Sequence, residues 1–229
     1  MCIRDRVSAD GGTTWVNATP SGSNWSASGV TLSSGTGTLS VRTIDTANNT
    51  TAGTGHSYTL DTTAPSETFP TVTLTSDTGA SSSDYITSNG AVHFAGTVAD
   101  AGGDGIGSVQ VFNGATLLGT ATVVAGNWSL DTTLAAGTYN NLKITVTDLA
   151  GNASTTANAQ TIVVDATAPS AVATVTALSA DTGTSSTDFI TNVAPQTVSG
   201  TFTGTLGPGE LIRVSADGGI TWVLSLIHI

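Results

Sequence analysis

Aspartate carries most of the charge that this sequence could use in chemistry. Fourteen of its 16 acidic residues are Asp, only five residues are Lys or Arg, and the formal net charge is −11 at pH 7. The short Asp side chain favours turns and loops, where several carboxylates can gather around one cation. The same charge makes nucleic acid and anionic membranes poor partners. Metal binding is therefore the first chemistry to consider.

Other reactive groups lack the neighbours that catalysis needs. His56 and His93 stand apart with no His-Glu-x-x-His pattern, and the sequence has no Gly-x-Ser-x-Gly elbow, phosphate loop ending in Lys, or paired Glu suited to sugar hydrolysis. Residues 100–105 are similar to the start of an EF-hand loop, but Val111 stands where that loop needs a bidentate Glu. We therefore expect neither an enzyme nor an EF-hand.

The two ends of the chain read as foreign sequence. Residues 1–6 and 224–229 can be translated from one DNA element in opposite directions, and that element resembles a transposon end used in sequencing libraries. Without them, 15 acidic and three basic residues remain, for a net charge of −12, and no Cys is left. Disulfides and thiolate ligands are then excluded, and we expect the natural gene to continue past both ends.

The sequence between these ends repeats with a period of about 104 residues. Residues 7–16 return almost unchanged as residues 214–223, an offset of 207, which is close to two periods. Asp61 begins a motif that recurs at Asp165, an offset of 104. Such a period is domain-sized, well above that of solenoid repeats. We predict the C-terminal part of a first repeat, a complete second repeat and the N-terminal half of a third, at residues 7–64, 68–168 and 170–223.

The composition predicts that each repeat is built from strands. The chain holds 44 Thr and 27 Gly but one Lys, and Thr favours strands whereas Gly and Asp favour turns. In the complete repeat, short alternations of apolar and polar residues recur every eight to twelve positions, as in a two-sheet sandwich. Trp128 lies on one of them as a core residue. The predicted strands are 72–75, 91–98, 108–112, 117–124, 128–130, 142–147 and 159–164. The predicted core faces are Val92, Phe94 and Val98; Val109 and Val111; Leu142, Ile144 and Val146; and Ile162 and Val164.

Several ordered motifs of the repeat resemble one family. They are Asp-Thr-Thr-Ala-Pro, Ser-Asp-Thr-Gly-x-Ser-Ser-x-Asp-x-Ile-Thr, Ser-Ala-Asp-Gly-Gly-x-Thr-Trp, Gly-Thr-Tyr and Thr-Asp-x-Ala-Gly-Asn, and they span nearly all of residues 7–223. Together they resemble the bacterial immunoglobulin-like (Ig-like) tandem repeats of large secreted adhesins and biofilm-associated surface proteins. The resemblance implies all-β, Ig-like β-sandwiches in an extracellular stalk on the bacterial cell surface, often stiffened by calcium at domain junctions. Its partners would be the neighbouring repeats.

The topology of such a sandwich places acidic residues at the junctions between repeats. After the complete repeat, Asp77 and Asp84 should converge on the linker residue Asp165. Before it, three predicted ligands should meet, with Asp100 or Asp104 nearby: Asp61, Asp148 and Asn152. Two carboxylates about 5 Å apart repel by about 3 kcal/mol at an effective dielectric constant of 20, and calcium would replace that repulsion with attraction. The first repeat departs from the motif at Asn48, where Gly is expected.

Two alternatives stay open at this level. The Asp side chains could instead cap their own turns through the backbone, without a metal ion. The chain could also be a carbohydrate- or protein-binding module or a spacer in a secreted hydrolase. A solvent-accessible pocket lined by Trp15, Trp25 or Trp128 would favour direct binding over a stalk.

Overall fold

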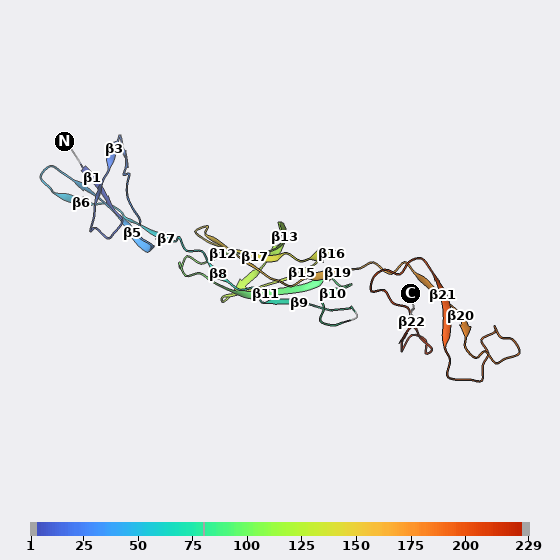
Figure 1. Cartoon of the computed structure of the whole chain (residues 1–229). Helices are drawn as coiled ribbons and strands as arrows, with labels where there is room; N and C mark the ends of the chain where they lie inside the picture. The colour runs from blue at the N-terminus through green and yellow to red at the C-terminus, as the bar shows by residue number, and fades with distance from the viewer. Residues whose placement is uncertain (1–3, 80, 226–229) are drawn as a thin grey trace. The chain divides into compact units, whose positions relative to one another are not determined.

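Short strands and turns make up the computed structural model, which describes residues 4–79 and 81–225 (Figure 1). The described residues contain no helix, and so none that is long and apolar enough to cross a membrane. The chain divides into two compact units, Met1–Ala166 and Thr167–Ile229. The all-β prediction is confirmed, since most strands pair into antiparallel sheets.

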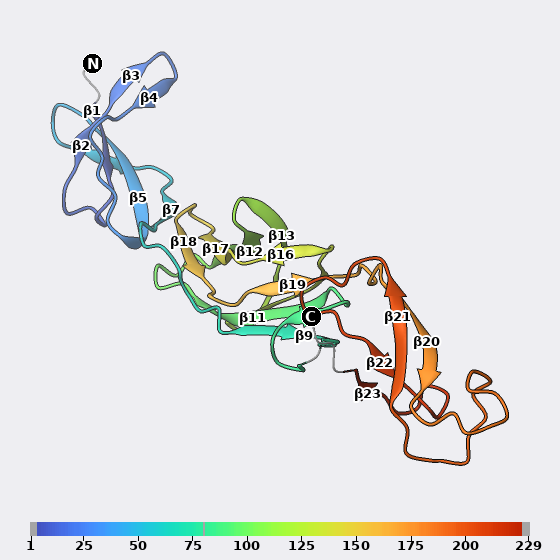
Figure 2. The same cartoon turned by 45° about the vertical axis from the view of Figure 1, so that its right-hand side comes forward.

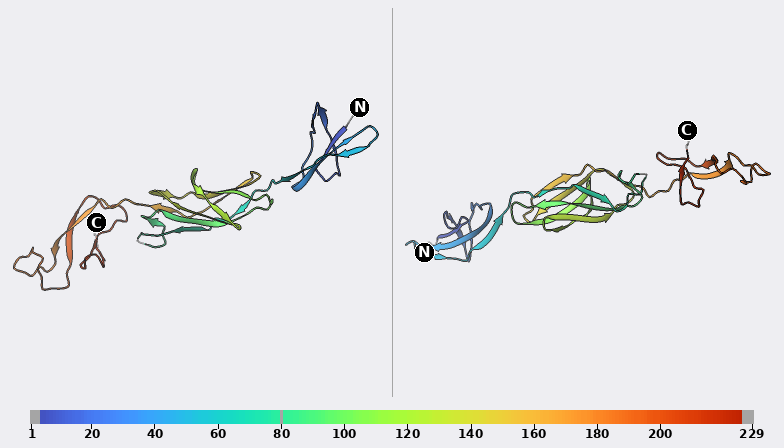
Figure 3. Two further views of the ribbon diagram at one scale, coloured as in Figure 1. Left: turned by 180° about the vertical axis from the view of Figure 1, so that it is seen from behind. Right: turned by 90° about the horizontal axis from the view of Figure 1, so that it is seen from below.

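Residues 66–164 fold into a sandwich of two main sheets (Figure 3). In one sheet, β11 is paired along one edge by β8 and β9 and along the other by β15, which β14 extends. The second sheet has the order β13-β12-β17-β18, and a small third one has the order β10-β19-β16. The strands are β8 (Ser66–Glu67), β9 (Thr71–Leu74), β10 (Ile86–Thr87), β11 (Ala91–Ala99), β12 (Ile106–Asn113), β13 (Thr116–Thr120), β14 (Thr122–Val124), β15 (Asn127–Thr133), β16 (Gly137–Tyr139), β17 (Leu142–Asp148), β18 (Ala153–Ala157) and β19 (Ile162–Val164).

The core of this sandwich consists of the predicted apolar faces. The residues on those faces are all buried, as is Trp128, which is 1% exposed. The Trp128 indole N–H donates a hydrogen bond to the Thr68 carbonyl at 3.0 Å. A Cβ on Gly96 would lie 2.1 Å from that carbonyl oxygen and 2.7 Å from the indole nitrogen, so only Gly fits beneath the ring. Burial of an indole of this size contributes about 4–6 kcal/mol.

Strand boundaries differ from the sequence prediction where the chain changes sheets. The predicted strand 117–124 is two strands, because β13 pairs with β12 in one sheet whereas β14 pairs with β15 in the other. Ala121 lies at the crossing, and its N–H bonds the Val109 carbonyl. The predicted strand 159–164 begins at Ile162, and β18 before it was missed. Strand β18 has the sequence Ala-Ser-Thr-Thr-Ala, which lacks the alternation of apolar and polar residues that predicts a strand.

The flanking segments contain partial sheets (Figure 2). The first comprises β1 (Arg4–Ser8), β2 (Val16–Asn17), β3 (Thr19–Ser21), β4 (Asn24–Ser26), β5 (Gly35–Ile44), β6 (Thr50–Ala52) and β7 (His56–Leu60). There β5 pairs with β1, β6 and β7, while β3 and β4 form a separate hairpin. Residues 4–6, predicted to be foreign, extend β1 along β5. The second comprises β20 (Val172–Leu178), β21 (Val198–Thr203), β22 (Arg213–Val214) and β23 (Val223–Leu224).

Candidate metal centre

The loop between β11 and β12 is shaped by Asp100. One oxygen of its carboxylate accepts a hydrogen bond from the Gly102 N–H, and the other accepts from the N–H groups of Gly103 and Gly105, at 2.8–2.9 Å. Gly103 and Gly105 have φ of +84° and +101°, which Gly adopts at little cost. These donors, Gly105 foremost, lower the pKa of Asp100. The loop therefore presents an ionised carboxylate near neutral pH.

Asp148 ends β17 and caps the turn that follows it. Its Oδ1 accepts hydrogen bonds from the N–H groups of Gly151 and Asn152, each at 2.7 Å, and its Oδ2 accepts one from the Asn152 side-chain amide at 2.9 Å. The same amide also donates to the Asp61 carbonyl at 3.2 Å. Asn152 thus ties the linker to the end of the sandwich. Asp148 itself is only 3% exposed.

Asp61 follows β7 in the linker and is buried at 8% exposure. Its Oδ1 accepts a hydrogen bond from the Thr63 N–H at 2.8 Å. Its Oδ2 is also buried and has no hydrogen-bond partner among the described residues. The carboxylate lies directly over Gly102, where a Cβ would come within 1.7 Å of Oδ2. A buried carboxylate oxygen without a donor is costly, so this arrangement calls for a positive ligand.

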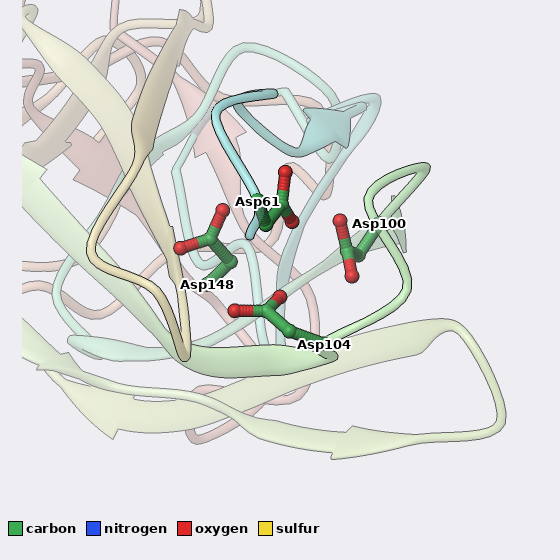
Figure 4. A group of neighbouring side chains, drawn as sticks. All are labelled: Asp61, Asp100, Asp104 and Asp148. Carbon is green, nitrogen blue, oxygen red and sulfur yellow. The ribbon is translucent and has the colours of Figure 1, made fainter. Parts of the chain in front are cut away.

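Four carboxylates converge at this end of the sandwich, as Figure 4 shows. Asp61, Asp100, Asp104 and Asp148 each offer one oxygen, and these oxygens all lie within 4.8 Å of one another. A second oxygen of the group, Oδ1 of Asp104, is also buried without a partner. Burial and then the charges of Asp148, Asp61 and Asp100 raise the pKa of Asp104. The group therefore holds more negative charge than its protein neighbours neutralise.

The predicted ligand sets differ in how the structure places them. Asp61, Asp148 and Asn152 do lie together, and both Asp100 and Asp104 join them. Sequence reasoning named these last two only as neighbours, although their spacing across a Gly-rich loop was visible.

The second predicted set, Asp77, Asp84 and Asp165, is not brought together in the same way. The Asp61 group is the only cluster of three or more potential metal-binding side chains in the part of the chain that the structure describes. Asp77 accepts a hydrogen bond from the Tyr85 N–H, and Asp84 accepts one from the Ile86 N–H, so both cap the loop before β10. The backbone N–H of the exposed Asp165 bonds the Thr87 carbonyl. Oδ1 of Asp77 is nevertheless buried without a partner among the described residues.

The sandwich matches one family of known domains. Residues 63–166 match the family model described as "Bacterial Ig-like domain". This segment is a bacterial Ig-like domain. The result confirms the resemblance noted from the sequence motifs for this segment.

Solved structures with some similarity include three multidomain proteins. Fibronectin(III)-like modules of CbhA from Clostridium thermocellum are 13% identical, with a TM-score of 0.40, over 71% of this chain and 77% of theirs. A tetra-tandem repeat from the extending region of a large adhesion protein is 23% identical, with a TM-score of 0.32, over 79% of this chain and 44% of its own. A Ca²⁺-stabilised adhesin from an Antarctic bacterium is 27% identical, with a TM-score of 0.34, over 78% and 44%. The chain thus matches less than half the length of the two adhesion proteins. No curated protein sequence matches it.

The turn at Asp45, in the segment before the Ig-like domain, is similar to the turn at Asp148. Asp45 accepts hydrogen bonds from the Ala47 and Asn49 N–H groups and from the Asn49 amide. The two bonds from Asn49 correspond to those that Asp148 accepts from Asn152. These bonds, that of the Asn49 amide foremost, lower the pKa of Asp45. Asn48 takes a φ of +67° where Gly151 takes +97°. Asn tolerates this region, so its departure from the motif leaves the turn intact.

The Trp side chains before residue 167 lie in three different settings. Trp128 is in the core. The Trp15 indole lies under the Arg42 guanidinium at 3.8 Å and donates to the Gly12 carbonyl. Trp25 is 47% exposed on its hairpin, and a hollow lined by Trp222 lies in the Thr167–Ile229 unit. The criterion that would favour direct ligand binding is therefore not met by Trp15 and Trp128.

Proposed function

We propose that this chain is a non-catalytic stalk segment of an extracellular bacterial adhesin, and that calcium stiffens the junction before its Ig-like domain. The observation that carries the proposal is the linker residue Asp61, which is buried among three carboxylates with an unpartnered oxygen. A stalk works by holding its repeats in line. A cation bound by the linker and by two loops of the next domain would perform that task.

The donor set supports calcium over other cations. All four side chains offer carboxylate oxygens, the ligands that hard cations prefer, and residues 7–223 contain no Cys. Ca²⁺–O distances of 2.3–2.6 Å place opposite ligands about 4.6–5.2 Å apart, whereas Mg²⁺ requires about 4.0–4.2 Å. The four oxygens lie within 4.8 Å of one another, a limit that leaves room for the larger ion. Asp61, Asp100, Asp104 and Asp148 would hold it, and it would supply the positive charge that the buried oxygens lack.

The cation would join three separate pieces of chain. Asp61 follows β7 of the first repeat, Asp100 and Asp104 belong to the β11–β12 loop, and Asp148 ends β17. Without the cation, Asp61 and Asp148 repel each other by at least about 3 kcal/mol at an effective dielectric constant of 20. The Asn152 amide bridges them directly. The proposed effect of calcium is therefore to lock the linker against the Ig-like domain.

Calcium titration of the whole chain tests the binding. We expect heat release by isothermal titration calorimetry and a higher melting temperature in calcium than in EDTA. An ion held at 100 times its Kd adds about 2.7 kcal/mol to the free energy of unfolding. Asp104→Asn should greatly reduce both signals. Asp131→Asn is the matched control, because Asp131 is exposed on β15 and pairs with His93, away from the centre. Equal signals in all three proteins would remove the basis of the proposal.

Spin labels across the linker test the stiffening itself. Thr51 and Thr116 are exposed, one in the first repeat and one in the Ig-like domain, and each can be replaced by Cys after Cys2→Ser. Calcium should narrow the label-to-label distance distribution measured by double electron–electron resonance. The Asp104→Asn variant should keep the broad distribution. Calcium binding without any narrowing would retain the metal site but refute the stalk mechanism.

The second predicted set remains part of the proposal. The unpartnered Oδ1 of Asp77 supports a further ion held by Asp77, Asp84 and Asp165. Calorimetric stoichiometry distinguishes one ion from two. If the second set binds, Asp77→Asn should remove one equivalent of calcium and leave the Asp104-dependent equivalent unchanged. If Asp77→Asn leaves the stoichiometry unaltered, Asp77 only caps its own loop.

A further inference from the structure

Two Asn-Gly dipeptides lie in the Ig-like domain, Asn89-Gly90 before β11 and Asn113-Gly114 at the end of β12. In such a dipeptide the backbone nitrogen of the Gly can attack the side-chain amide of the Asn, because no Cβ on the Gly hinders the approach. A five-membered succinimide ring then forms and ammonia leaves. Whether the two groups can meet depends on how the fold holds them.

Both reacting groups of Asn113-Gly114 are held by Asn141. The Gly114 N–H donates a hydrogen bond to the Asn141 carbonyl at 2.9 Å, and Oδ1 of Asn113 accepts one from the Asn141 N–H at 3.0 Å. The Gly114 nitrogen must lose its proton before it attacks, so the first of these bonds has to break. Asn113 is also paired with Leu142 in the sheet, which resists the rotation that ring closure requires. This dipeptide is therefore protected.

The nitrogen of Asn89-Gly90 lacks that restraint. The Gly90 carbonyl accepts a hydrogen bond from the Leu134 N–H at 2.8 Å, but the Gly90 N–H forms no hydrogen bond within the part of the chain that the structure describes. Asn89 is exposed and lies between strands, so water can reach its amide. The nucleophile can thus lose its proton without breaking a hydrogen bond.

The Asn89 amide is also positioned for the attack. Its Oδ1 accepts a hydrogen bond from the Ala91 N–H at 3.0 Å, so the side chain spans Gly90 in an Asx turn, which brings the amide carbon towards the Gly90 nitrogen. The Asn89 N–H donates to Oγ1 of Thr87 at 3.0 Å. Thr87 is 2% exposed, and its own hydroxyl donates to the Ser76 carbonyl at 2.8 Å. The Ala91 N–H would stabilise the negative charge that develops on Oδ1 during the attack.

Packing fixes the Gly of this dipeptide but not the Asn. Gly90 is buried, and a Cβ there would lie 2.0 Å from the Leu134 carbonyl oxygen, so an unhindered nucleophile is retained. At an offset of 104, Val193 stands in place of Asn89 and donates its N–H to Oγ1 of Thr191 at 3.1 Å. That turn therefore forms without a side-chain amide.

We propose that Asn89 is a site of spontaneous deamidation in the folded chain, whereas Asn113 is protected. A base in the solvent removes the Gly90 N–H proton, and the nitrogen forms a bond to Cγ of Asn89. The Cγ–Nδ2 bond breaks, and Nδ2 takes a proton from water and leaves as ammonia. Water then opens the ring. Attack at Cγ gives Asp, and attack at the backbone carbonyl gives isoaspartate; no oxidant or reductant is needed.

Either product changes the start of β11. Asp adds a negative charge two residues after Thr87, whose carbonyl accepts the Asp165 N–H. Isoaspartate adds one carbon to the backbone before Gly90, which has no room to shift against Leu134. The isoaspartate form should therefore melt at a lower temperature. The inference is independent of the proposed function, because Asn89 belongs to neither set of calcium ligands.

Peptide mapping by mass spectrometry tests the proposal on the full chain aged in mildly alkaline buffer, once folded and once unfolded in guanidinium chloride. In the unfolded chain Asn89 and Asn113 should deamidate at similar rates. In the folded chain Asn89 should deamidate at least about tenfold faster, because only Gly114 must first break a hydrogen bond. Similar rates in the folded chain, or an Asn89 that stays intact after folding, overturn the proposal.

Asn89→Val is the matched variant, since Val193 occupies the equivalent turn. The original chain should lose one ammonia and then gain one water in its intact mass, become a substrate for isoaspartate methyltransferase, and melt at a lower temperature as it ages. The variant should show none of these changes over the same period. A variant that ages to the same extent places the reaction at another residue and refutes the assignment to Asn89.

Discussion

Replacing Asp61 with Asn should have opposite effects on stability with and without calcium. The substitution keeps the shape of the side chain, and its carbonyl oxygen can still accept the Thr63 N–H bond. It removes one negative charge from a buried position within 4.8 Å of Asp148. It also places an amide donor where Oδ2 now has no partner, next to several carboxylate acceptors. In EDTA, both changes favour the folded state.

The expected magnitude follows from the distance. Two charges 4.8 Å apart repel by about 3.5 kcal/mol at an effective dielectric constant of 20. Solvent near the half-buried part of the cluster screens this, so we expect a gain on the order of 1–2 kcal/mol, or roughly 4–10 °C in Tm for a domain of this size. In calcium the variant lacks a charged ligand. A tenfold weaker Kd alone would subtract about 1.4 kcal/mol from the stabilisation by the ion.

Differential scanning calorimetry of both chains in EDTA and in saturating calcium gives the four melting temperatures needed. The variant should melt above the original chain in EDTA and show a much smaller rise on addition of calcium. Asp131→Asn should follow the original chain in both buffers. If Asp61→Asn instead melts lower in EDTA and responds fully to calcium, then Asp61 is an ordinary capping residue and the electrostatic reasoning is wrong.

Three further substitutions or titrations test other parts of the structure. Gly102→Ala should abolish the calcium-induced rise in Tm while keeping all four carboxylates, because its Cβ would lie 1.7 Å from Oδ2 of Asp61; an undiminished rise would contradict the geometry. Trp128→Ala should cost about 3–5 kcal/mol in urea unfolding with or without calcium, and a cost below 1 kcal/mol would show that the core is not built around it. Hydrogen bonds led by the Thr14 hydroxyl lower the pKa of Asp10, so they stabilise its loop fully above pH 3.8, and this stabilisation is lost progressively as the pH falls from there through the depressed pKa. Carbon-detected NMR titration should show the Asp10 carboxyl protonating below the usual value, and protonation near pH 3.8 would refute those bonds.

The core of the Ig-like domain could be predicted because its strands alternate cleanly. Val92 and Phe94 on β11 and Leu142 and Ile144 on β17 follow the period of two that a half-buried strand requires. Strands without apolar residues could not be found in this way. The Ser and Thr residues of β18 take part in the sheet through backbone pairing, and Glu67 receives hydrogen bonds from Ser154 and Thr156 across the sandwich edge. Polar pairing of this kind leaves no periodic signal.

The candidate centre could be predicted only in part, for a similar reason. Asp61, Asp148 and Asn152 were found because the order of strands fixes which loops share an end of the sandwich. The contribution of Asp100 depends on the Gly-rich loop folding back on its own carboxylate, which is a matter of local φ values. Conversely, Asp77 and Asp84 satisfy neighbouring N–H groups first. The order of strands predicts at which end of the sandwich an Asp lies. It does not predict whether the carboxylate oxygens of that Asp are already hydrogen-bonded to neighbouring N–H groups.

Repetition of sequence does not by itself repeat the centre, as the segment after the Ig-like domain shows. At an offset of 104, Gly204 and Pro208 stand where the Ig-like domain has Asp100 and Asp104. The acid that remains in this loop, Glu210, accepts a hydrogen bond from the Gly207 N–H at 2.8 Å, and its own N–H bonds the Gly207 carbonyl. The loop is therefore closed by its own side chain and contributes no carboxylate in the positions of Asp100 and Asp104. Individual loops, rather than the repeat as a whole, must decide where a cation binds along such a chain.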